Sequence, residues 1–554
     1  MRFRLLLLLL TFSSLLTTSV FATDLQQGLV GHWPLATDGK DHSGNGRDAV
    51  VNGTIEFKVE GPGGLTGASK FNGRDSSLEI PAGKLPQLGT GDFTVSLWVR
   101  TPDAAGDVLG DLVSQYDPAA RRGFHLTLKS QAVTTTQAND RQLTFGIDDN
   151  REMPWEDAGR PGNALLAFGM AVHEGELYAA TCEPGLGESG HVYRYGGGQS
   201  WVDVGAPDAS NTVTALAVYH GSLYAASGKY RVAGSALKES ENITLGGRVF
   251  RYDGPGRWTD CGQLPGVEAI GGLIVFRDKL YASSLYRPAG FYRYETGREW
   301  TDCGTPDGKR VVALCVYRDH LYASSYDGGF VFRYDGSTWT DLGQLADNTQ
   351  TYAFAVYRGR LFCGTWPSGR VYRFEDAGQW ADVGRLGEEL EVMGMLVHNG
   401  RLMAGTLPLA SVYTFDGTNQ WTFSKQIDQT PDVKFRRAWT MAEHRGRLYC
   451  STLPSGRIHA YEAGKNVQAG TTFPTGWQHV AATRTEGRLS LLLNGKLLAS
   501  RELAAGDRYN LTTDRPLRIG FGENNFFRGS LADVRIYQRA LSREELETLA
   551  KPPR

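Results

Sequence analysis

The sequence predicts an all-β protein in which a seven-bladed β-propeller is inserted into a β-sandwich. Three observations support this fold class. A β-rich repeat occurs seven times, the last element of the repeat stands in front of the first copy, and two flanking stretches carry a different strand pattern. The 554 residues include 69 glycines, which indicates many turns, and 41% hydrophobic residues, which is typical of a globular protein. A chain of this length is expected to hold two or three domains.

The repeat combines an apolar strand, a tight turn, an "LYAAS"-like strand, a variable loop, a "GRVFRYDG"-like strand and a final W-x-D-x-G element. Residues 311–343 are a clean copy, and their period-two alternation predicts a four-stranded antiparallel meander. The second strands of the seven copies begin at Leu177, Leu223, Leu280, Leu321, Leu361, Leu402 and Leu448. Four-stranded repeats of about 40–50 residues are typical of a β-propeller.

The tryptophan of the final element shows how the ring closes. It occurs in six copies, at Trp201, Trp258, Trp300, Trp339, Trp380 and Trp421. The seventh copy ends in "GRIHAYEAGKNVQAG" without a tryptophan, whereas "MPWEDAGRPG" places Trp155, Asp157 and Gly159 in front of the first copy. A ring of blades has no free edge only when the first and last blades are joined. The sequence therefore predicts that the N-terminal strand completes the seventh blade.

Over residues 153–465 the repeat resembles kelch-like propellers, which share its "LY" strand after a tight turn, its "RYD" element and its tryptophan strand. This chain has "AAS", "ASS" or "AGT" where kelch repeats carry a double glycine.

The flanking stretches, residues 26–150 and 471–550, alternate in strand pattern, but neither alone has enough strands for a stable sandwich. Together they resemble one laminin-G-like, concanavalin A-like jelly-roll domain. The motifs that carry the resemblance are "HWPLATDGKDHSGNG", "FTVSLWV", "GWQHVAATR", "LLLNGK" and "GSLADVRIYQRALS". The propeller is then inserted between "LTFGIDDN" and "GWQHV", which is tolerated when the two ends of the inserted part are neighbours.

The same resemblance implies a structural calcium ion, with Asp41, Asn45 and Asp533 at the matching positions. Oxygen ligands from a turn and a distant strand suit a hard cation. The alternative is that Asp41 and Asn45 in "DHSGNG" only form the hydrogen bonds of a turn.

A ligand-binding face is expected where the loops between the second and third strands open on one end of the propeller. In blades two to five these loops carry Tyr230, Arg231, Tyr286, Arg287, Tyr326, Asp327 and Trp366. Aromatic faces with a few polar partners suit recognition of sugars or peptides. The alternative is that the rings pack against neighbouring blades. The long loop at residues 228–246 is expected to form a wall or lid over this face.

The N-terminus predicts export. "MRFR" supplies positive charge, an apolar stretch follows, and "VFA" places small residues before a cleavage site after Ala22. A retained anchor is less favoured because serine and threonine break the apolar run, and no second hydrophobic span follows. The cysteines recur at equivalent repeat positions, such as Cys261 and Cys303, and are expected to remain free thiols.

A net charge of −2 and the lack of a basic stripe argue against nucleic acid as a partner. No His-Glu-x-x-His, Gly-x-Ser-x-Gly or phosphate-loop motif is present. We therefore expect a secreted, non-enzymatic protein that binds extracellular carbohydrate or protein through the jelly roll and the propeller loop face. Two alternatives remain open. One is an exported glycoside hydrolase or lyase whose carboxylates come from separate blades, and the other is a structural surface or matrix protein.

Overall fold

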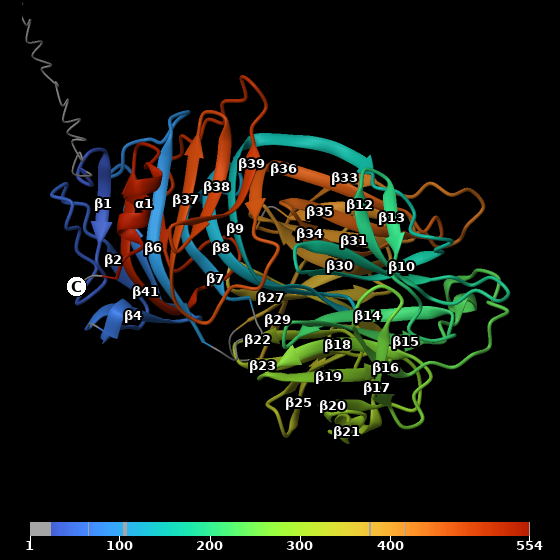
Figure 1. Ribbon diagram of the computed structural model, residues 1–554. Coiled ribbons are helices and arrows are strands. Elements are labelled where there is room, and N and C mark those ends of the chain that lie inside the picture. Colours follow the sequence, from blue (N-terminus) through green and yellow to red (C-terminus); the bar gives the residue numbers. More distant parts are fainter. Residues whose placement is uncertain (1–23, 65, 103–107, 376–377, 416, 553–554) are drawn as a thin grey trace, which may run out of the picture.

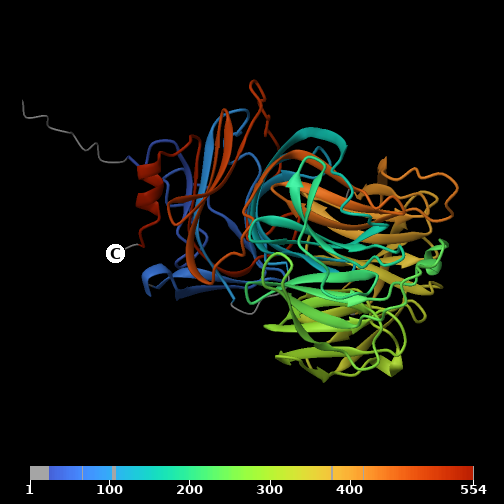
Figure 2. The same cartoon turned by 45° about the vertical axis from the view of Figure 1, so that its right-hand side comes forward.

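The computed structural model describes residues 24–64, 66–102, 108–375, 378–415 and 417–552, so the predicted leader at residues 1–22 lies outside the described residues. Two β-rich parts lie side by side (Figure 1). One contains both ends of the described chain, in blue and red, and the other contains its middle, in green to orange. A view turned by 45° shows the same division (Figure 2). No helix in the described part of the chain is long and apolar enough to cross a membrane.

The first part is a sandwich of two antiparallel sheets built from both flanking stretches. One sheet runs β3-β4-β41-β6-β37-β38-β39, with β1 also paired to β41. Its strands are β1 (Leu29–Trp33), β3 (Ile55–Glu60), β4 (Thr66–Asn72), β6 (Phe93–Thr101), β37 (Gly476–Thr485), β38 (Arg488–Leu493), β39 (Lys496–Glu502) and β41 (Arg528–Tyr537). The other sheet contributes β2 (Val50–Asn52), β5 (Ser77–Ile80), β40 (Leu517–Ile519), β7 (Gly110–Asp117), β8 (Arg122–Val133) and β9 (Thr136–Asp157).

The two flanking stretches share one core. β6 pairs with β37 along its whole length, from Phe93 to Thr101. Phe93 packs against Phe124 and Phe145 of the facing sheet, with ring centroids 5.2 and 5.8 Å apart. These side chains belong to one buried cluster that also contains Val480 and other residues from both stretches. A short helix, α1 (Arg543–Leu549), follows the last strand and begins with a capping box at Ser542.

The second part is the propeller, and six of its blades follow the chain in order. The first blade consists of β10 (Leu166–His173), β11 (Glu176–Cys182), β12 (Val192–Gly197) and β13 (Ser200–Asp203), and the second of β14 (Thr212–Tyr219), β15 (Ser222–Gly228), β16 (Arg248–Tyr252) and β17 (Trp258–Gln263). The third blade consists of β18 (Ile270–Phe276), β19 (Lys279–Ser284), β20 (Phe291–Thr296) and β21 (Glu299–Asp302), and the fourth of β22 (Leu314–Tyr317), β23 (His320–Ser324), β24 (Phe330–Tyr334) and β25 (Trp339–Gln344). The fifth blade consists of β26 (Gln350–Tyr357), β27 (Arg360–Trp366), β28 (Arg370–Phe374) and β29 (Trp380–Arg385), and the sixth of β30 (Glu391–His398), β31 (Arg401–Leu407), β32 (Ser411–Phe415) and β33 (Trp421–Gln426). Short 3-10 turns occur at Pro62–Gly64, Val232–Ser235 and Pro306–Gly308.

The seventh blade is closed from the front of the repeat region. It consists of β34 (Arg437–His444), β35 (Arg447–Leu453), β36 (Ile458–Gln468) and the end of β9, in which Asp157 lies opposite His459. The Trp155 indole stacks on Tyr461 with ring centroids 4.9 Å apart, and its Nε1–H donates to Ser424 Oγ of the sixth blade at 3.1 Å. The predicted all-β fold class, with a propeller closed by an N-terminal strand, is confirmed.

The final element has a packing role in every blade, and it keeps the aspartate and glycine of W-x-D-x-G in all blades except the sixth. Its tryptophan lies against the aromatic residue that ends the third strand, as Trp339 does against Tyr334 at 4.8 Å. The aspartate side chain accepts a hydrogen bond from the glycine two residues later, as Asp341 does from Gly343 at 2.7 Å. Gly343 has φ of 91°, which favours glycine. The motif is therefore explained by blade packing and turn geometry, without a ligand.

The hairpin of β8 and β9 is inserted along the propeller axis. It contacts the innermost strand of all seven blades, β10, β14, β18, β22, β26, β30 and β34. Near its tip, Thr134 Oγ1–H donates to Trp439 O at 3.1 Å, and Thr135 Oγ1–H donates to Thr214 O at 2.7 Å. Lower in the channel, Lys129 forms a buried ion pair with Glu443. A cavity of about 30 Å³ remains beside the hairpin, enough for a water molecule or two.

The junction between the two parts is a pair of continuous strands. β9 and β36 pair in the blade, where Glu152 lies opposite Ala463, and again in the sandwich, where Phe145 lies opposite Val467. The sequence suggests a boundary near residues 150–153, yet one strand passes through it. The reason is that strand pairing can continue from one sheet into the next without a turn.

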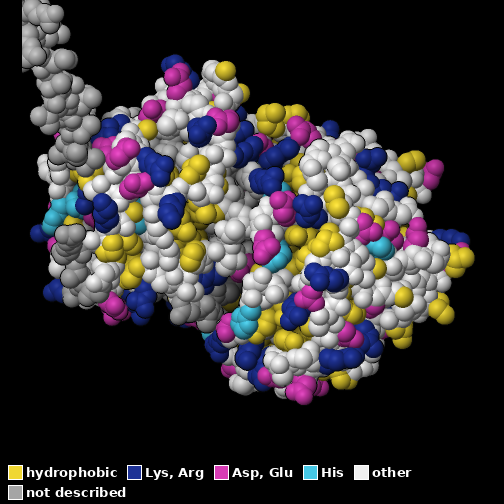
Figure 3. Space-filling view, in the orientation of Figure 1, with side chains coloured by type: hydrophobic (Ala, Val, Ile, Leu, Met, Phe, Trp, Pro, Cys, Tyr) yellow, Lys and Arg dark blue, Asp and Glu magenta, His cyan; other side chains and the backbone are white. Residues whose placement is uncertain are grey.

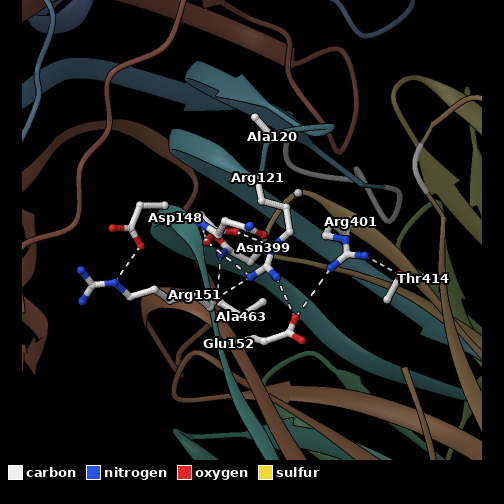
Figure 4. A network of polar contacts seen from close by, with 12 residues as sticks. Ala120, Arg121, Asp148, Arg151, Glu152, Asn399, Arg401, Thr414 and Ala463 are labelled. Carbon is white, nitrogen blue, oxygen red and sulfur yellow. Dashed lines mark hydrogen bonds and ion pairs between the residues drawn. The ribbon is translucent and has the colours of Figure 1, made fainter. Parts of the chain in front are cut away.

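Polar contacts fix the angle at this junction (Figure 4). The Arg121 guanidinium, from the turn after β7, contacts Asp148 at 3.2 Å and Glu152 at 2.7 Å, both on β9. Glu152 also lies 4.0 Å from Arg401 of the sixth blade. On the same blade, Asn399 Nδ2–H donates to Ala463 O at 2.7 Å. The sandwich is thus joined to the propeller by strands, side chains and the axial hairpin together.

The thiols behave as expected. All six cysteines are thiols outside any disulfide bond, and five of them are buried, namely Cys182, Cys261, Cys315, Cys363 and Cys450. Burial raises the pKa of Cys182 to about 12, so this thiol is unreactive at neutral pH.

Candidate functional site

The two ends of the propeller differ in what covers them. The turns between first and second strands face the sandwich, since Tyr116 Oη–H donates to Asn399 O at 3.1 Å and Arg358 N–H donates to Glu523 O at 3.0 Å. The loops between second and third strands open at the opposite end. We call this end the loop face. The sandwich does not cover this end of the propeller, so a ligand can approach it.

The structure gathers the aromatic residues that the sequence singles out. Tyr230, Tyr286, Tyr326 and Trp366 all belong to one apolar cluster on the loop face. The Arg231 guanidinium lies 4.5 Å from the centre of the Tyr286 ring, and the Arg231 N–H donates to Tyr286 Oη at 3.1 Å. Arg231 also pairs with Glu268. Rings from separate blades are therefore linked by polar contacts.

The charged members of the predicted set form a second link. Arg287 lies 3.2 Å from one carboxylate oxygen of Asp327, and Arg310 lies 2.7 Å from the other. The Arg310 guanidinium also faces the Tyr326 ring at 5.8 Å. The side chains of Arg287 and Arg231 are 66% and 55% exposed, so they remain accessible to a ligand.

Burial divides the aromatic set. Tyr230 is only 7% exposed, and its ring packs against Phe168 with centroids 5.1 Å apart. The Tyr230 ring therefore packs within the propeller, which is the alternative that the sequence left open. Tyr286, Tyr326 and Trp366 are only partly buried, so each of these residues keeps some exposed surface.

Sequence reasoning missed four residues that complete this face: Tyr352, Glu391, Phe435 and Arg437. Tyr352 packs on Tyr326 with centroids 4.7 Å apart, and Phe435 lies edge-on to Trp366 at 6.1 Å. Glu391 and Arg437 are the first residues of innermost strands β30 and β34. The signal that could have revealed them is a charged residue at the start of an otherwise apolar innermost strand.

Glu391 is the electrostatically unusual group of the face. Its Oε1 atom is buried and has no hydrogen-bond partner among the described residues. Burial raises the pKa of Glu391 to about 7, against the opposing effects of Arg437 and of a hydrogen bond with Tyr352. Arg437 is held by Ser235, to whose Oγ its Nη1–H donates at 2.6 Å. The carboxyl group can therefore bind or release a proton near neutral pH.

The long blade-two loop is a fixed wall of this site. Glu239 accepts hydrogen bonds from the backbone N–H groups of Val232 and Ala233 at 3.2 and 3.1 Å. Asn242 Nδ2–H donates to Glu188 O at 2.7 Å, which ties the loop to the first blade. The loop is thus attached to the first blade through Asn242 and to Arg437 of the seventh blade through the Ser235 hydroxyl.

Of the three residues matched to a calcium site, Asp41 and Asp533 accept hydrogen bonds, whereas Asn45 donates them. Asp41 accepts backbone hydrogen bonds from His32 at 3.0 Å and from Ser43 at 2.9 Å. Asp533 Oδ1 contacts His32 Nε2 at 2.7 Å and Arg535 Nη2 at 3.0 Å, while Asn45 Nδ2–H donates to Val30 O at 3.0 Å. As placed, these groups do not fit a calcium ligand set, because the Asp41 and Asp533 carboxylates already accept hydrogen bonds and Asn45 presents its Nδ2–H group to backbone oxygens. Calcium binding stays a prediction.

Among the residues that the structure describes, no three or more His, Cys, Asp or Glu side chains come together in a way that could hold a metal ion.

One family pattern and several solved structures resemble parts of the chain. The sequence pattern of the concanavalin A-like lectin/glucanases superfamily matches residues 410–547. No curated protein sequence matches the chain.

Solved propellers resemble the chain at low sequence identity. A streptogramin B lyase has a TM-score of 0.46 and 10% identity, over 56% of this chain and 98% of its own. The WD40 β-propeller domain of Doa1 has a TM-score of 0.41 and 11% identity, over 56% and 98%. YCF48 from Cyanidioschyzon merolae has a TM-score of 0.40 and 12% identity, over 56% and 99%.

Proposed function

We propose that this chain is an exported, non-enzymatic binding protein that recognises an extracellular carbohydrate or protein on the loop face, with the jelly-roll sandwich as a second binding surface. The match to the concanavalin A-like lectin/glucanases superfamily supports a binding role for the sandwich. Export after cleavage at Ala22 and a kelch-like origin of the blades are parts of the same proposal.

The observation that carries the proposal is the composition of the loop face. Partly exposed rings of Tyr286, Tyr326 and Trp366 lie beside the exposed guanidinium groups of Arg231 and Arg287. Flat apolar surfaces bind the apolar faces of sugars or the side chains of a peptide, and charged donors fix their orientation. The ion pairs hold these donors in place before a ligand arrives, which lowers the entropy cost of binding.

The alternative of an exported hydrolase or lyase is favoured by one observation, the buried Glu391. A carboxyl group with a pKa of about 7 suits general acid or base catalysis at neutral pH. Against this, the axial hairpin fills the channel beneath the face, and its tip contacts Trp439 and Thr214. The space available to a substrate is therefore limited to the outer surface.

The test combines a glycan array, probed with the purified mature protein, and product analysis of any glycan that binds. Trp366→Ala and Tyr326→Ala are expected to weaken binding at least tenfold. Phe423→Ala changes a residue that is 55% exposed on β33, the outermost strand of the sixth blade, and it serves as the matched control that is expected to bind normally.

Binding without turnover, lost in both loop-face variants, supports the proposal. Binding that all three variants retain would place the ligand elsewhere on the chain. Release of shortened or unsaturated products would instead establish the enzymatic alternative, and Glu391→Gln would then be expected to abolish it.

A further inference from the structure

A second groove lies at the side of the propeller, away from the loop face. It encloses about 640 Å³ between β12 and β13 of the first blade, the turn before β35 in the seventh blade, and the sandwich strand β39. Its charged lining consists of Arg194, Arg445, Arg447, Arg501 and Glu176. Figure 3 shows Lys and Arg side chains gathered where the sandwich meets the propeller, over β36 and β39. A groove of this volume is suited to a small molecule.

Two of the arginines are committed to structural contacts. Arg501 Nη1 and Nη2 contact the two carboxylate oxygens of Glu462 at 2.8 and 3.2 Å, which ties β39 to β36. Arg447 Nη2–H donates to Glu156 Oε2 at 2.6 Å, but its Nε atom is buried without a hydrogen-bond partner among the described residues. Arg447 therefore retains one donor that its protein surroundings leave unused.

The other two arginines share a single carboxylate. Arg445 lies 3.1 Å from Glu176, and Arg194 lies 3.9 Å from the same side chain. In the described part of the chain no hydrogen bond from the Arg194 guanidinium is found, and its side chain is 40% exposed. Two guanidinium groups facing one carboxylate leave a surplus positive charge and several free N–H donors.

The neighbouring histidine does not add to this charge. Burial lowers the pKa of His444 to about 4, so the ring is neutral at pH 7. Its Nε2 atom is bonded to Gly175 O at 3.0 Å. The positive charge of the groove therefore comes from arginine alone, and it does not change between pH 5 and 9. Arginine is the side chain best suited to planar or tetrahedral anions, because it offers two parallel donors.

We infer that this groove binds a small anion with at least two carboxylate, phosphate or sulfate groups, held between Arg194 and Arg445. One acidic group adds to Glu176 as a partner of these guanidinium groups, and a second reaches toward the side chain of Arg447, which is 23% exposed. Glu176 is then an internal competitor for the ligand. This inference is independent of the loop face and of the function proposed for it.

The test is calorimetric titration of the mature protein with pyrophosphate and citrate at low ionic strength, and with inorganic sulfate as a comparison anion that has one acidic group. The probe that binds identifies the acidic group. Arg194→Gln is expected to weaken binding at least tenfold, whereas Glu176→Gln is expected to tighten it several-fold, because it removes the competing carboxylate. Arg298→Gln, at an exposed arginine on a turn of the third blade, is the matched control and is expected to bind as the wild type does.

Opposite effects of the two groove variants would support the inference, since damage to the fold cannot tighten binding. Failure of both pyrophosphate and citrate to bind at millimolar concentration would overturn it, and so would a sulfate affinity equal to theirs. An equal affinity of wild type, Arg194→Gln and Glu176→Gln for the probe that binds would overturn it as well.

Discussion

At the scale of single residues, the loop face combines groups whose positions follow from the repeat with groups whose positions do not. The predicted residues Tyr286, Tyr326 and Trp366 could be found because loops between strands carry function in propellers, and aromatic side chains in loops are conspicuous. Glu391 and Arg437 could not be found in this way. They begin apolar strands, where local pattern indicates core, and only the ring brings the sixth and seventh blades together at the axis.

The buried Glu391 leads to a prediction about pH. The pKa of Glu391 is about 7 in the folded state, above the ordinary value of 4.5. Between pH 4.5 and pH 7 the carboxyl group is therefore protonated in the folded state and ionised in the unfolded state. The contribution of this group to stability is therefore present at pH 4 and decreases as pH rises to 7, by about 3 kcal/mol in all. Glu391→Gln is expected to melt at a higher temperature than wild type at pH 8 and at a similar temperature at pH 4.5.

Calorimetric melting at the two pH values measures this effect. Other groups with raised pKa values, such as Glu523, act equally in both proteins and cancel in the comparison. Glu388→Gln changes a neighbouring carboxylate whose side chain is 92% exposed, and it is expected to follow wild type at both values. A difference between Glu391→Gln and wild type that is the same at pH 4.5 and 8 would show that the carboxyl group is ionised throughout.

At the scale of elements, the closing strand is predictable and the axial hairpin is not. The position of β9 in the last blade follows from one missing tryptophan in the seventh copy and one extra tryptophan at residue 155. The hairpin around Thr134 has the alternation of an ordinary sandwich strand. Its partners are strands spread over the whole propeller, so no local sequence signal marks the insertion.

The closing strand can be tested by its tryptophan. Trp155→Ala removes the stack on Tyr461 and the hydrogen bond to Ser424, and it is expected to destabilise the protein by about 2–4 kcal/mol. Trp339→Ala, which removes the equivalent stack within one continuous blade, is the matched comparison. The two melting temperatures are expected to fall by similar amounts. If Trp155→Ala left the melting temperature unchanged while Trp339→Ala lowered it, the stability of the seventh blade would not depend on the strand supplied by β9.

The axial hairpin can be tested by its buried ion pair. Lys129 is paired with Glu443, which also contacts His398 Nδ1 at 2.8 Å, and all three side chains are buried. Lys129→Met leaves a buried carboxylate without its main partner and is expected to cost about 3–5 kcal/mol. The double variant Lys129→Met with Glu443→Gln is expected to recover part of this loss, because no uncompensated charge remains.

Melting temperatures of the two single variants and the double variant form a cycle that measures the coupling between the two residues. Lys238→Met removes a lysine whose side chain is 86% exposed and is expected to have little effect. Additive effects of Lys129→Met and Glu443→Gln would exclude an energetically coupled pair in the channel.

At the scale of the whole molecule, the two parts are bound more closely than an inserted domain requires. Chain ends that lie close together would suffice for insertion. Here two strands pass through the junction, Arg121 bridges it, and the hairpin fills the propeller axis. The split of the sandwich could be predicted, because each flanking stretch lacks strands that the other supplies. The mutual dependence could not, since it arises from contacts between distant segments.

This arrangement predicts that sandwich and propeller unfold together. Wild type is expected to give one calorimetric transition, detected at the same temperature by tryptophan fluorescence. Replacing residues 132–138 with Asn-Gly keeps a hairpin turn between the paired residues Gln131 and Asn139 but withdraws the tip that bonds Trp439 and Thr214. In this variant the propeller loses contacts along its axis, so it is expected to melt first, in a separate transition at lower temperature. Asn-Gly in place of Gly197-Gly198, in an exposed outer turn, is the control. Two separate transitions in wild type, or a shortened hairpin that still melts in one step at the wild-type temperature, would show that the hairpin occupies the channel without supporting the ring.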